Sequence, residues 1–351
     1  MILVASRDAM EWKLLLLDRE ATAIKMEIHH TKSQYMVINS KDDEPFILRN
    51  IVISHTDKYV YLGTPIINAS LKNHVKAHIN SKQDHLMKFS ASLKKNKDAP
   101  FAVKELAFKS ALSSAVLYGC ESWLCNNHKF AVSAILSAEK QLLAVRNQTC
   151  SDLVQVELGY PEIKTMIKEN QIKFLEKLFS RADFEESPTQ SALQLSLQAG
   201  SQAGKYVNSL MQAVPGSFKK DGLKTLRSKI TESDSSRRKT YCELNSHLSR
   251  HPMYSANIPE HERVAFTRLR LGSHWLKIET GRWSRIPEAE RLCKCGSVQN
   301  EKHVLLNCPE SSLLRKLFPT LNFDSLKSLM DDEPKNIAKY CQLLMEKYDR
   351  L

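Results

Sequence analysis

The spacing of hydrophobic and polar residues changes at about residue 70. Before it, one amphipathic helix is expected from Asp8 to about His29, with Asp8 and Glu11 as its capping box. Short apolar runs typical of strands occur at 2–5, 34–39, 46–48 and 58–62, and the turn-forming stretch SKDDEP separates two of them. The pattern predicts a small N-terminal segment that contains both helix and strands.

After residue 70 the apolar residues recur with helical periodicity. Long helices are predicted at about 70–96, 102–124, 128–148 and 161–182, and shorter ones at about 236–249, 259–271, 309–317, 323–330 and 334–348. Residues 183–235 are richer in Ser, Gln and Ala and predict a loose helical linker region. The chain is therefore expected to be α+β and mostly α, with a helical body behind a small α/β segment.

The chain is strongly basic, with 51 Lys and Arg against 39 Asp and Glu and a net charge of +12. This excess favours a polyanionic partner, nucleic acid before a membrane surface, although a solvated basic surface without a partner stays open. The first twenty residues are interrupted by charges, so they do not form a signal peptide, and no apolar run is long enough to span a membrane. We expect an intracellular protein of the cytoplasm, the nucleus or both, which is not secreted and has no membrane partner.

Three of the eight cysteines cluster with a histidine near the C-terminus, while five are scattered and predict inert thiols. Cys293, Cys295, His303 and Cys308 have the spacing C-x-C-x7-H-x4-C. Gly296 allows a tight turn after the second cysteine, and Pro309 disfavours helical geometry at Cys308, which lets the chain turn back toward His303. Four such ligands predict a closed, structural zinc site; three buried thiols and a surface histidine are the alternative.

A basic and aromatic stretch directly precedes this cluster. Residues 262–294 carry eight Lys and Arg against four Glu, with Phe266, Trp275 and Trp283 among them. Cations for phosphates beside aromatic rings for bases predict a surface for single-stranded nucleic acid. The residues expected to make the contacts are Arg268, Arg270, Arg282, Trp283 and Arg285. The alternative is that both tryptophans anchor the core and only the arginines face solvent. Residues 219–250 are also basic, and a solvated helix face explains them equally well.

Several short motifs resemble the C-terminal region of non-LTR (LINE-type) retrotransposon reverse transcriptases. Arg268-Leu269-Arg270-Leu271-Gly272 is similar to the family's R-L-R-x-G stretch, and His303–Asn307 with Cys308 is similar to its H-x-L-x-x-C ending. Near the N-terminus, residues 28–36 resemble an I-N-x-x-K-T-x-x-M stretch, and Tyr61-Leu62-Gly63 resembles the Y-L-G of the primer grip. The resemblance implies that Tyr61, Leu62 and Gly63 also contact nucleic acid.

The same resemblance implies a division of the chain. Residues 1–68 would be a palm remnant, 69–182 a helical thumb-like domain, 183–255 a helical linker region, and 256–351 a basic C-terminal domain with a zinc knuckle. The expected partners are RNA and single-stranded or nicked DNA, with no small-molecule substrate. A host-retained zinc-containing module that binds RNA or another protein remains the alternative.

The resemblance also bears on catalysis. In this family a pair of metal-binding aspartates directly precedes a strand like residues 2–5, which places the pair upstream of Met1. The Asp42-Asp43 pair stands in a loop-like stretch instead. Mg²⁺ is therefore expected only in the full-length parent enzyme. Lys32 matches a family lysine near the phosphates of the incoming nucleotide, and we interpret it as vestigial. No catalytic residue and no polymerase activity are expected of this chain.

Overall fold

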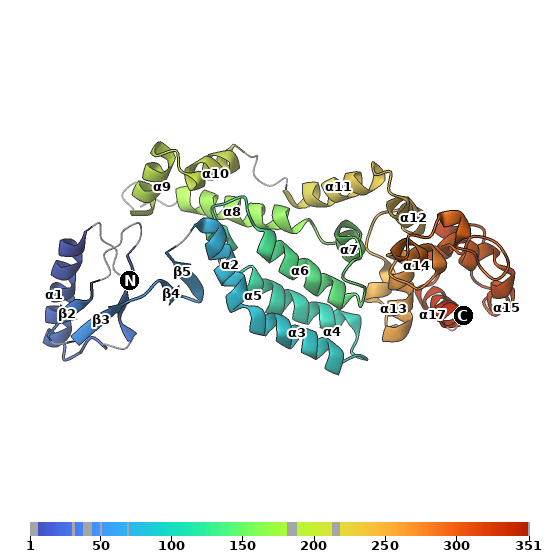
Figure 1. Cartoon of the computed structure of the whole chain (residues 1–351), viewed down its shortest axis with the longest axis horizontal. Coiled ribbons are helices and arrows are strands. Elements are labelled where there is room, and N and C mark those ends of the chain that lie inside the picture. Colours follow the sequence, from blue (N-terminus) through green and yellow to red (C-terminus); the bar gives the residue numbers. More distant parts are fainter. Residues whose placement is uncertain are drawn as a thin grey trace. The chain divides into compact units, whose positions relative to one another are not determined.

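The computed structural model describes residues 6–29, 32–37, 44–49, 51–68, 70–180, 188–212 and 218–349. The chain divides into two compact units, Met1–Ser81 and Lys82–Leu351. The second is helical over most of its described length, and small sheets occur in the first (Figure 1). The predicted class, α+β and mostly α, is confirmed. The predicted strand at 2–5 and the Asp42-Asp43 pair lie outside the described residues.

The first element that the structure describes is helix α1 (Arg7–Ala23), which ends six residues before the predicted His29. Ser6 caps it, because its hydroxyl accepts from the amide of Ala9 at 3.3 Å, so the predicted Asp8–Glu11 capping box was wrong. Met10 and Leu14 of α1 pack against a small core of Tyr35, Phe46 and Ile53. These three core residues come from three different strands, so this packing attaches the helix to one sheet.

That sheet has the order β1-β3-β2. Strands β1 (Gln34–Tyr35) and β3 (Ile51–His55) are parallel, while β2 (Phe46–Leu48) and β3 are antiparallel. A separate hairpin joins β4 (Lys58–Tyr61) to β5 (Thr64–Ile67), and α2 (Leu71–Ser81) packs on β5. The prediction of β2 is confirmed and that of β4 nearly so, whereas β3 and β5 were missed. Helix α2 belongs to the first compact unit, which ends at Ser81.

The helical unit begins with elements that follow the predicted periodicity. They are α3 (Gln83–Lys95), α4 (Phe101–Ala107), a π-helical segment (Phe108–Ser113) that runs into α5 (Ser114–Val116), α6 (Lys129–Leu142), α7 (Ser151–Leu158) and α8 (Ile163–Phe179). The helix predicted over 102–124 stops at Val116, and Gly119 takes a left-handed conformation (φ 71°) soon after it. Helix α7 was not predicted.

Residues predicted as a loose linker form three helices in their described parts. These are α9 (Pro188–Gln198), α10 (Gln202–Met211) and α11 (Phe218–Thr231). Tyr206, Val207 and Leu210 of α10 pack on Ile172 and Leu175 of α8, and α11 lies along α8 as well. The described part of 183–235 therefore belongs to the helical body, and the interpretation as a linker is corrected.

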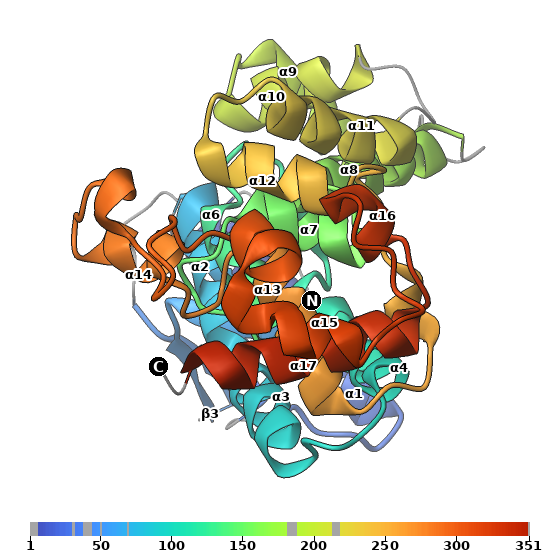
Figure 2. The ribbon, with the colours of Figure 1, turned by 90° about the vertical axis from the view of Figure 1, so that its right-hand side faces the viewer.

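The C-terminal part has its own core. It contains α12 (Ser236–Leu244), α13 (Glu260–Arg270), α14 (Lys277–Trp283), α15 (Ser312–Lys316), α16 (Leu326–Met330) and α17 (Pro334–Asp349). Helices α13 and α17 pack against each other (Figure 2). Phe266 and Leu269 of α13 meet Ile337 and Leu344 of α17 in a core that also includes Cys293 and Cys308. Within the described ranges, no helix combines the length and the apolar character that crossing a bilayer requires.

Candidate metal centre and nucleic-acid surface

The structure brings Cys293, Cys295, His303 and Cys308 together. Their ligand atoms all lie within 4.8 Å of one another. The Sγ atom of Cys308 is 3.6 Å from Sγ of Cys293 and 3.9 Å from Sγ of Cys295, and Cys295 Sγ is 3.1 Å from Nε2 of His303. Two sulfurs bound to one tetrahedral zinc at ~2.3 Å would stand about 3.8 Å apart, close to both sulfur separations. The four side chains could therefore hold one metal ion, and their spacing fits zinc.

The local backbone explains why two of the ligands share one turn. The amide of Cys293 donates to Ser297 O at 2.7 Å, and the amide of Gly296 donates to Cys293 O at 3.0 Å. Gly296 has φ 86°, a conformation that glycine adopts without a steric penalty. These bonds close a tight loop that presents Cys293 and Cys295 on one side, as the sequence predicted.

The other two ligands come from a short π-helical segment, His303–Asn307, and the residue after it. The side-chain oxygen of Asn300 accepts from the amide of His303 at 2.8 Å and caps the start of this turn. Cys308 is extended (φ −63°, ψ 126°), so its side chain leaves the helical course and returns to the cluster. The predicted effect of Pro309 on Cys308 is confirmed.

The surroundings of Cys293 and His303 favour the deprotonated forms that bind a metal. Burial alone would raise the pKa of the Cys293 thiol, but hydrogen bonds from the Cys295 backbone and the neighbouring thiols outweigh burial and lower it. Burial, and then the charge of Arg315, lower the pKa of His303, which favours the neutral imidazole that binds metals. In Cys308, by contrast, burial raises the thiol pKa. A cation in the centre would favour the thiolate there as well.

Comparison with protein-family models, with curated proteins and with solved structures finds no match to this chain. The resemblance to non-LTR retrotransposon reverse transcriptases therefore remains a prediction.

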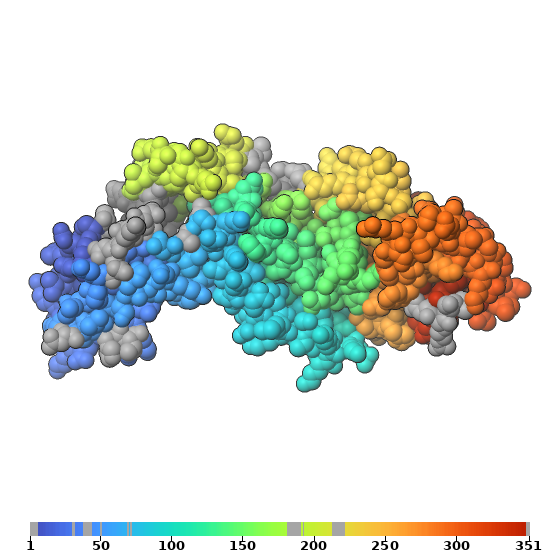
Figure 3. Space-filling view, in the orientation of Figure 1, coloured from blue at the N-terminus to red at the C-terminus, as the bar shows by residue number. Residues whose placement is uncertain are grey.

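Two half-exposed tryptophans lie on the segment that includes α14 (orange in Figure 3), Trp275 just before the helix and Trp283 at its end. Trp275 is 56% exposed and Trp283 46% exposed, and their rings meet edge to face with centroids 5.4 Å apart. The alternative that both tryptophans are core anchors is thereby excluded. Their rings are available at the surface, as base stacking requires.

Arg146 joins these tryptophans from a distant part of the chain. Its guanidinium lies 3.9 Å from the centre of the Trp283 ring, and its Nη2 donates to Gly272 O at 3.0 Å. Its backbone amide donates to the hydroxyl of Ser273 at 2.9 Å. Sequence reasoning missed Arg146, because nothing around it indicates a partner more than 120 positions away. Arg146 therefore adds a cation next to the two exposed tryptophan rings.

The predicted arginine contacts differ in their exposure. Arg268 is exposed and donates through Nε to Ala144 O at 2.8 Å, and Arg285 is exposed as well. Arg282 bonds to the buried Glu279 and to Ser236, so much of its charge is neutralised within the protein. We name the set of Arg146, Arg268, Trp275, Lys277, Trp283 and Arg285 the tryptophan surface.

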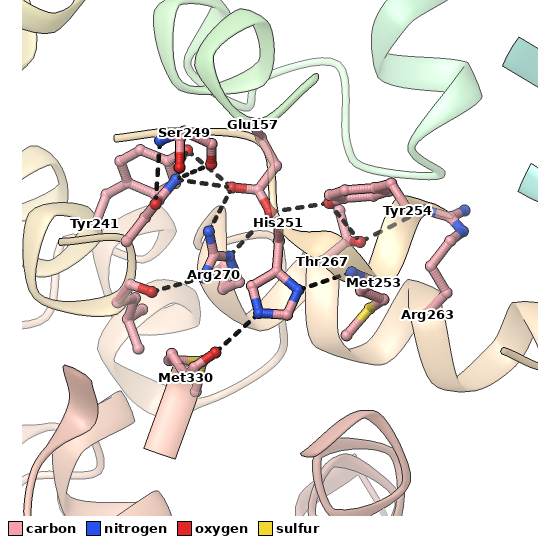
Figure 4. Close-up of polar contacts among 12 residues, drawn as sticks. Glu157, Tyr241, Ser249, His251, Met253, Tyr254, Arg263, Thr267, Arg270 and Met330 are labelled. Carbon is pink, nitrogen blue, oxygen red and sulfur yellow. Dashed lines mark hydrogen bonds and ion pairs between the residues drawn. The ribbon is translucent and has the colours of Figure 1, made fainter. Parts of the chain in front are cut away.

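Arg270 is not part of this surface, and its predicted role as a nucleic-acid contact was wrong. Its side chain is buried and forms two bonds to the carboxylate of Glu157, at 2.9 and 3.0 Å (Figure 4). Tyr241 and Tyr254 donate to the same carboxylate at 2.8 and 2.9 Å. A buried, fully paired guanidinium is not available to a phosphate. Arg270 instead ties α13 to α7.

The predicted contacts in the first unit lie at the hairpin tip. Leu62 and Gly63 both have positive φ, 48° and 78°, which is the conformation of a two-residue type I′ turn. Leu62 is 73% exposed, and Tyr61 precedes it on β4. Lys32 is exposed beside β1. The structure thus places Tyr61, Leu62, Gly63 and Lys32 at the surface of the first unit.

Proposed function

We propose that this chain is a nucleic-acid-binding C-terminal part of a non-LTR retrotransposon reverse transcriptase, in which a structural zinc ion holds the binding surface in place. The observation that carries the proposal is that exposed tryptophans and arginines and the Cys/His cluster occur on one segment of about forty residues, 268–308. The motif resemblance described above supplies the family, and the net charge of +12 supports a polyanionic partner.

Zinc would be held by Cys293, Cys295, His303 and Cys308, which fill the four positions of a closed structural site. In such a site the bound ion supplies folding energy rather than chemistry. The chain's own contribution is to connect this site to the core: Cys293 and Cys308 are buried, and Arg315 donates to Cys308 O at 2.9 Å. Ordering the metal-binding loop that begins at Cys293 also orders the nearby Arg291. The Nη1 atom of Arg291 donates to Ile278 O at 2.9 Å and supports α14.

The tryptophan surface would bind a single strand in two ways. Arg268, Lys277 and Arg285 are exposed and can contact phosphates without regard to sequence. Trp275 is the more exposed of the two rings and offers a base a flat apolar face. Trp275 and Arg268 also border a hollow of about 230 Å³ between α13 and α17, beside which a base can be accommodated. These features favour RNA or single-stranded DNA over duplex, because stacking needs unpaired bases.

We propose further that the chain, as given, binds nucleic acid without extending a primer. Nucleotidyl transfer needs carboxylates that hold two metal ions, and we assign no residue of this chain to that role. Incubation with a primed template, nucleotides and Mg²⁺ or Mn²⁺ should give no extension. Template-dependent extension that is lost when Asp42 and Asp43 are replaced would overturn this part of the proposal.

The binding proposal is tested by titrating a labelled single-stranded RNA and following its fluorescence anisotropy. The zinc-loaded chain should bind, and the same chain stripped of zinc by a chelator should bind at least tenfold more weakly and recover when zinc is returned. Equal RNA binding by the zinc-loaded and zinc-free forms would show that the binding surface does not depend on the metal. No binding by either form at low salt would overturn nucleic-acid binding altogether and favour a protein-interaction module.

A further inference from the structure

A groove along α6 carries a second concentration of positive charge that the proposed function does not use. It has a volume of about 610 Å³ and is bordered by Lys129, Lys140 and Lys164, together with serine and asparagine side chains. The face of the helical unit drawn in Figure 3 exposes the green segment to which α6 belongs. Lys129 and Lys164, which border the groove, are exposed.

The amphipathic pattern of α6 produces this groove. Ala131, Ile135, Ala138 and Leu142 face the interior and are buried. On the opposite side Lys129, Ser133, Ser137 and Lys140 line the groove at helical spacing, together with the apolar Val132 and Leu136. Lys129 and Lys140 lie eleven positions apart, about 16 Å along the helix. A linear charged ligand can thus follow the helix.

The charges of the groove are not neutralised by the protein. Within the described part of the chain, no Asp or Glu lines the groove, and none of its three lysines forms an ion pair. Other lysines of this unit do have partners: Lys104 lies 2.8 Å from Glu260, Lys173 lies 2.8 Å from Glu169, and Lys229 lies 3.0 Å from Glu162. Lys129 and Lys164 are exposed and therefore available to an anion from outside, while Lys140 is half-buried and donates to the backbone of Asn147.

Nearby carboxylates do not cancel this charge. Glu139 points to the interior, and burial raises its pKa to about 8, so it is mostly neutral at pH 7. Asp152 is paired with Arg238 at 2.6 Å, and Glu162 is paired with Lys229. Neutral donors add to the cations: the side chains of Ser133, Ser137, Ser151 and three asparagines line the groove and suit phosphate oxygens.

One end of the groove meets the tryptophan surface. Asn147 lines the groove, its backbone oxygen accepts from Lys140 Nζ at 2.7 Å, and its neighbour Arg146 lies on the Trp283 ring. We propose that the α6 groove binds the phosphodiester backbone of the same single strand whose bases stack on the tryptophan surface. The inference rests on the proposed function and extends its contact path from α14 along α6.

The test compares two charge-matched double variants of the full, zinc-loaded chain by RNA anisotropy. Lys129→Gln with Lys164→Gln removes two exposed groove cations, while Lys173→Gln with Lys239→Gln removes two exposed lysines that pair with Glu169 and Asp234. The groove variant should bind about 25-fold more weakly at 0.1 M salt, from roughly 0.7 log units for each of the two lost phosphate contacts. The control variant should bind nearly as well as the unmodified chain.

A second readout locates the contact directly. Bound oligonucleotide should protect Lys129 and Lys164 from an amine-reactive reagent, as measured by peptide mass spectrometry, while Lys173 stays reactive. Inorganic phosphate at the same ionic strength should not protect them if the site takes a strand rather than a single ion. If both double variants bind RNA equally well and the oligonucleotide does not protect Lys129 and Lys164, the proposal that the groove binds RNA is wrong. The proposal for the tryptophan surface is not affected by that result. If the unmodified chain does not bind RNA at all, the proposed function itself is wrong.

Discussion

The guanidinium of Arg270 and the carboxylate of Glu157 form a two-point ion pair in which both side chains are buried. Nε lies 2.9 Å from Oε1 and Nη2 lies 3.0 Å from Oε2, while Nη1 donates to Leu244 O at 2.7 Å. Each charge is thus satisfied within the core, as a buried ion pair requires. The pair connects α7 of the helical body to α12 and α13, which precede the metal centre.

Replacing Arg270 by Ala leaves the Glu157 charge buried and unpaired, which should cost about 3–5 kcal/mol of the free energy of unfolding. Arg268→Ala is the matched control, because Arg268 lies two positions away and is exposed; it should cost under about 1 kcal/mol. Urea denaturation of the two variants measures the difference. Equal losses would show that the Arg270–Glu157 pair does not hold α13 in place.

The metal centre was predictable because its information is local. Four ligands lie within sixteen residues, and Gly296 and Pro309 act on their immediate neighbours, so spacing and backbone preference sufficed. Arg270 was misassigned for the opposite reason. Its partner Glu157 is 113 positions earlier, and an arginine in a basic stretch has the same appearance in a sequence whether it meets a phosphate or a buried carboxylate.

The fold also shows that local patterns can be predicted from the sequence and that features without one cannot. Helices α8 and α17 have long periodic patterns and were predicted close to their observed bounds, whereas α6 ends six residues before the predicted 148. Helices α7 and α14 span only eight and seven residues, and a segment this short does not show a helical periodicity that could be recognised in the sequence. Strand β5 contains Pro65, which argues against a strand unless the residue lies at an edge, and the hairpin with β4 provides that position.

The metal prediction is one zinc ion per chain, counted by native mass spectrometry. Cys308→Ser should abolish stoichiometric binding, because it removes one of four ligands. Cys242→Ser is the matched control, since that thiol is half-buried and outside the cluster, and it should leave the zinc content at one. Unchanged zinc in Cys308→Ser would exclude Cys308 as a ligand.

Glu139 predicts a pH dependence of stability. Burial raises its pKa to about 8, above the value near 4.5 of the unfolded chain, so the folded state holds a proton that the unfolded state has lost between these values. Its contribution to the unfolding free energy should therefore fall as pH rises through this window, by roughly 1.4 kcal/mol per pH unit.

Glu139→Gln removes this titration. The variant should be more stable than the unmodified chain at pH 8, and the two should converge near pH 4.5. Denaturant unfolding at both values checks the prediction. A difference of the same size at both pH values would assign the effect to packing rather than to the proton.

Trp275→Ala should weaken RNA binding by about 1–3 kcal/mol if a base stacks on this ring, while the salt dependence stays the same. The matched control is Trp12→Ala on α1. Trp12 lies outside the tryptophan surface and is 63% exposed, compared with 56% for Trp275. The control should bind RNA normally. If Trp275→Ala lowered thermal stability and left RNA affinity unchanged, the ring would have a structural role instead.

The most direct test of the account is the salt dependence of single-stranded RNA binding. The triple variant Arg268→Ala, Lys277→Ala, Arg285→Ala should flatten the slope of log K against log salt by about 2, at ~0.7 per phosphate contact. A control triple variant of the ion-paired lysines Lys173, Lys239 and Lys339 should keep the slope of the unmodified chain. A slope that the tryptophan-surface variant leaves untouched, with binding intact, would contradict the claim that this surface contacts the nucleic acid.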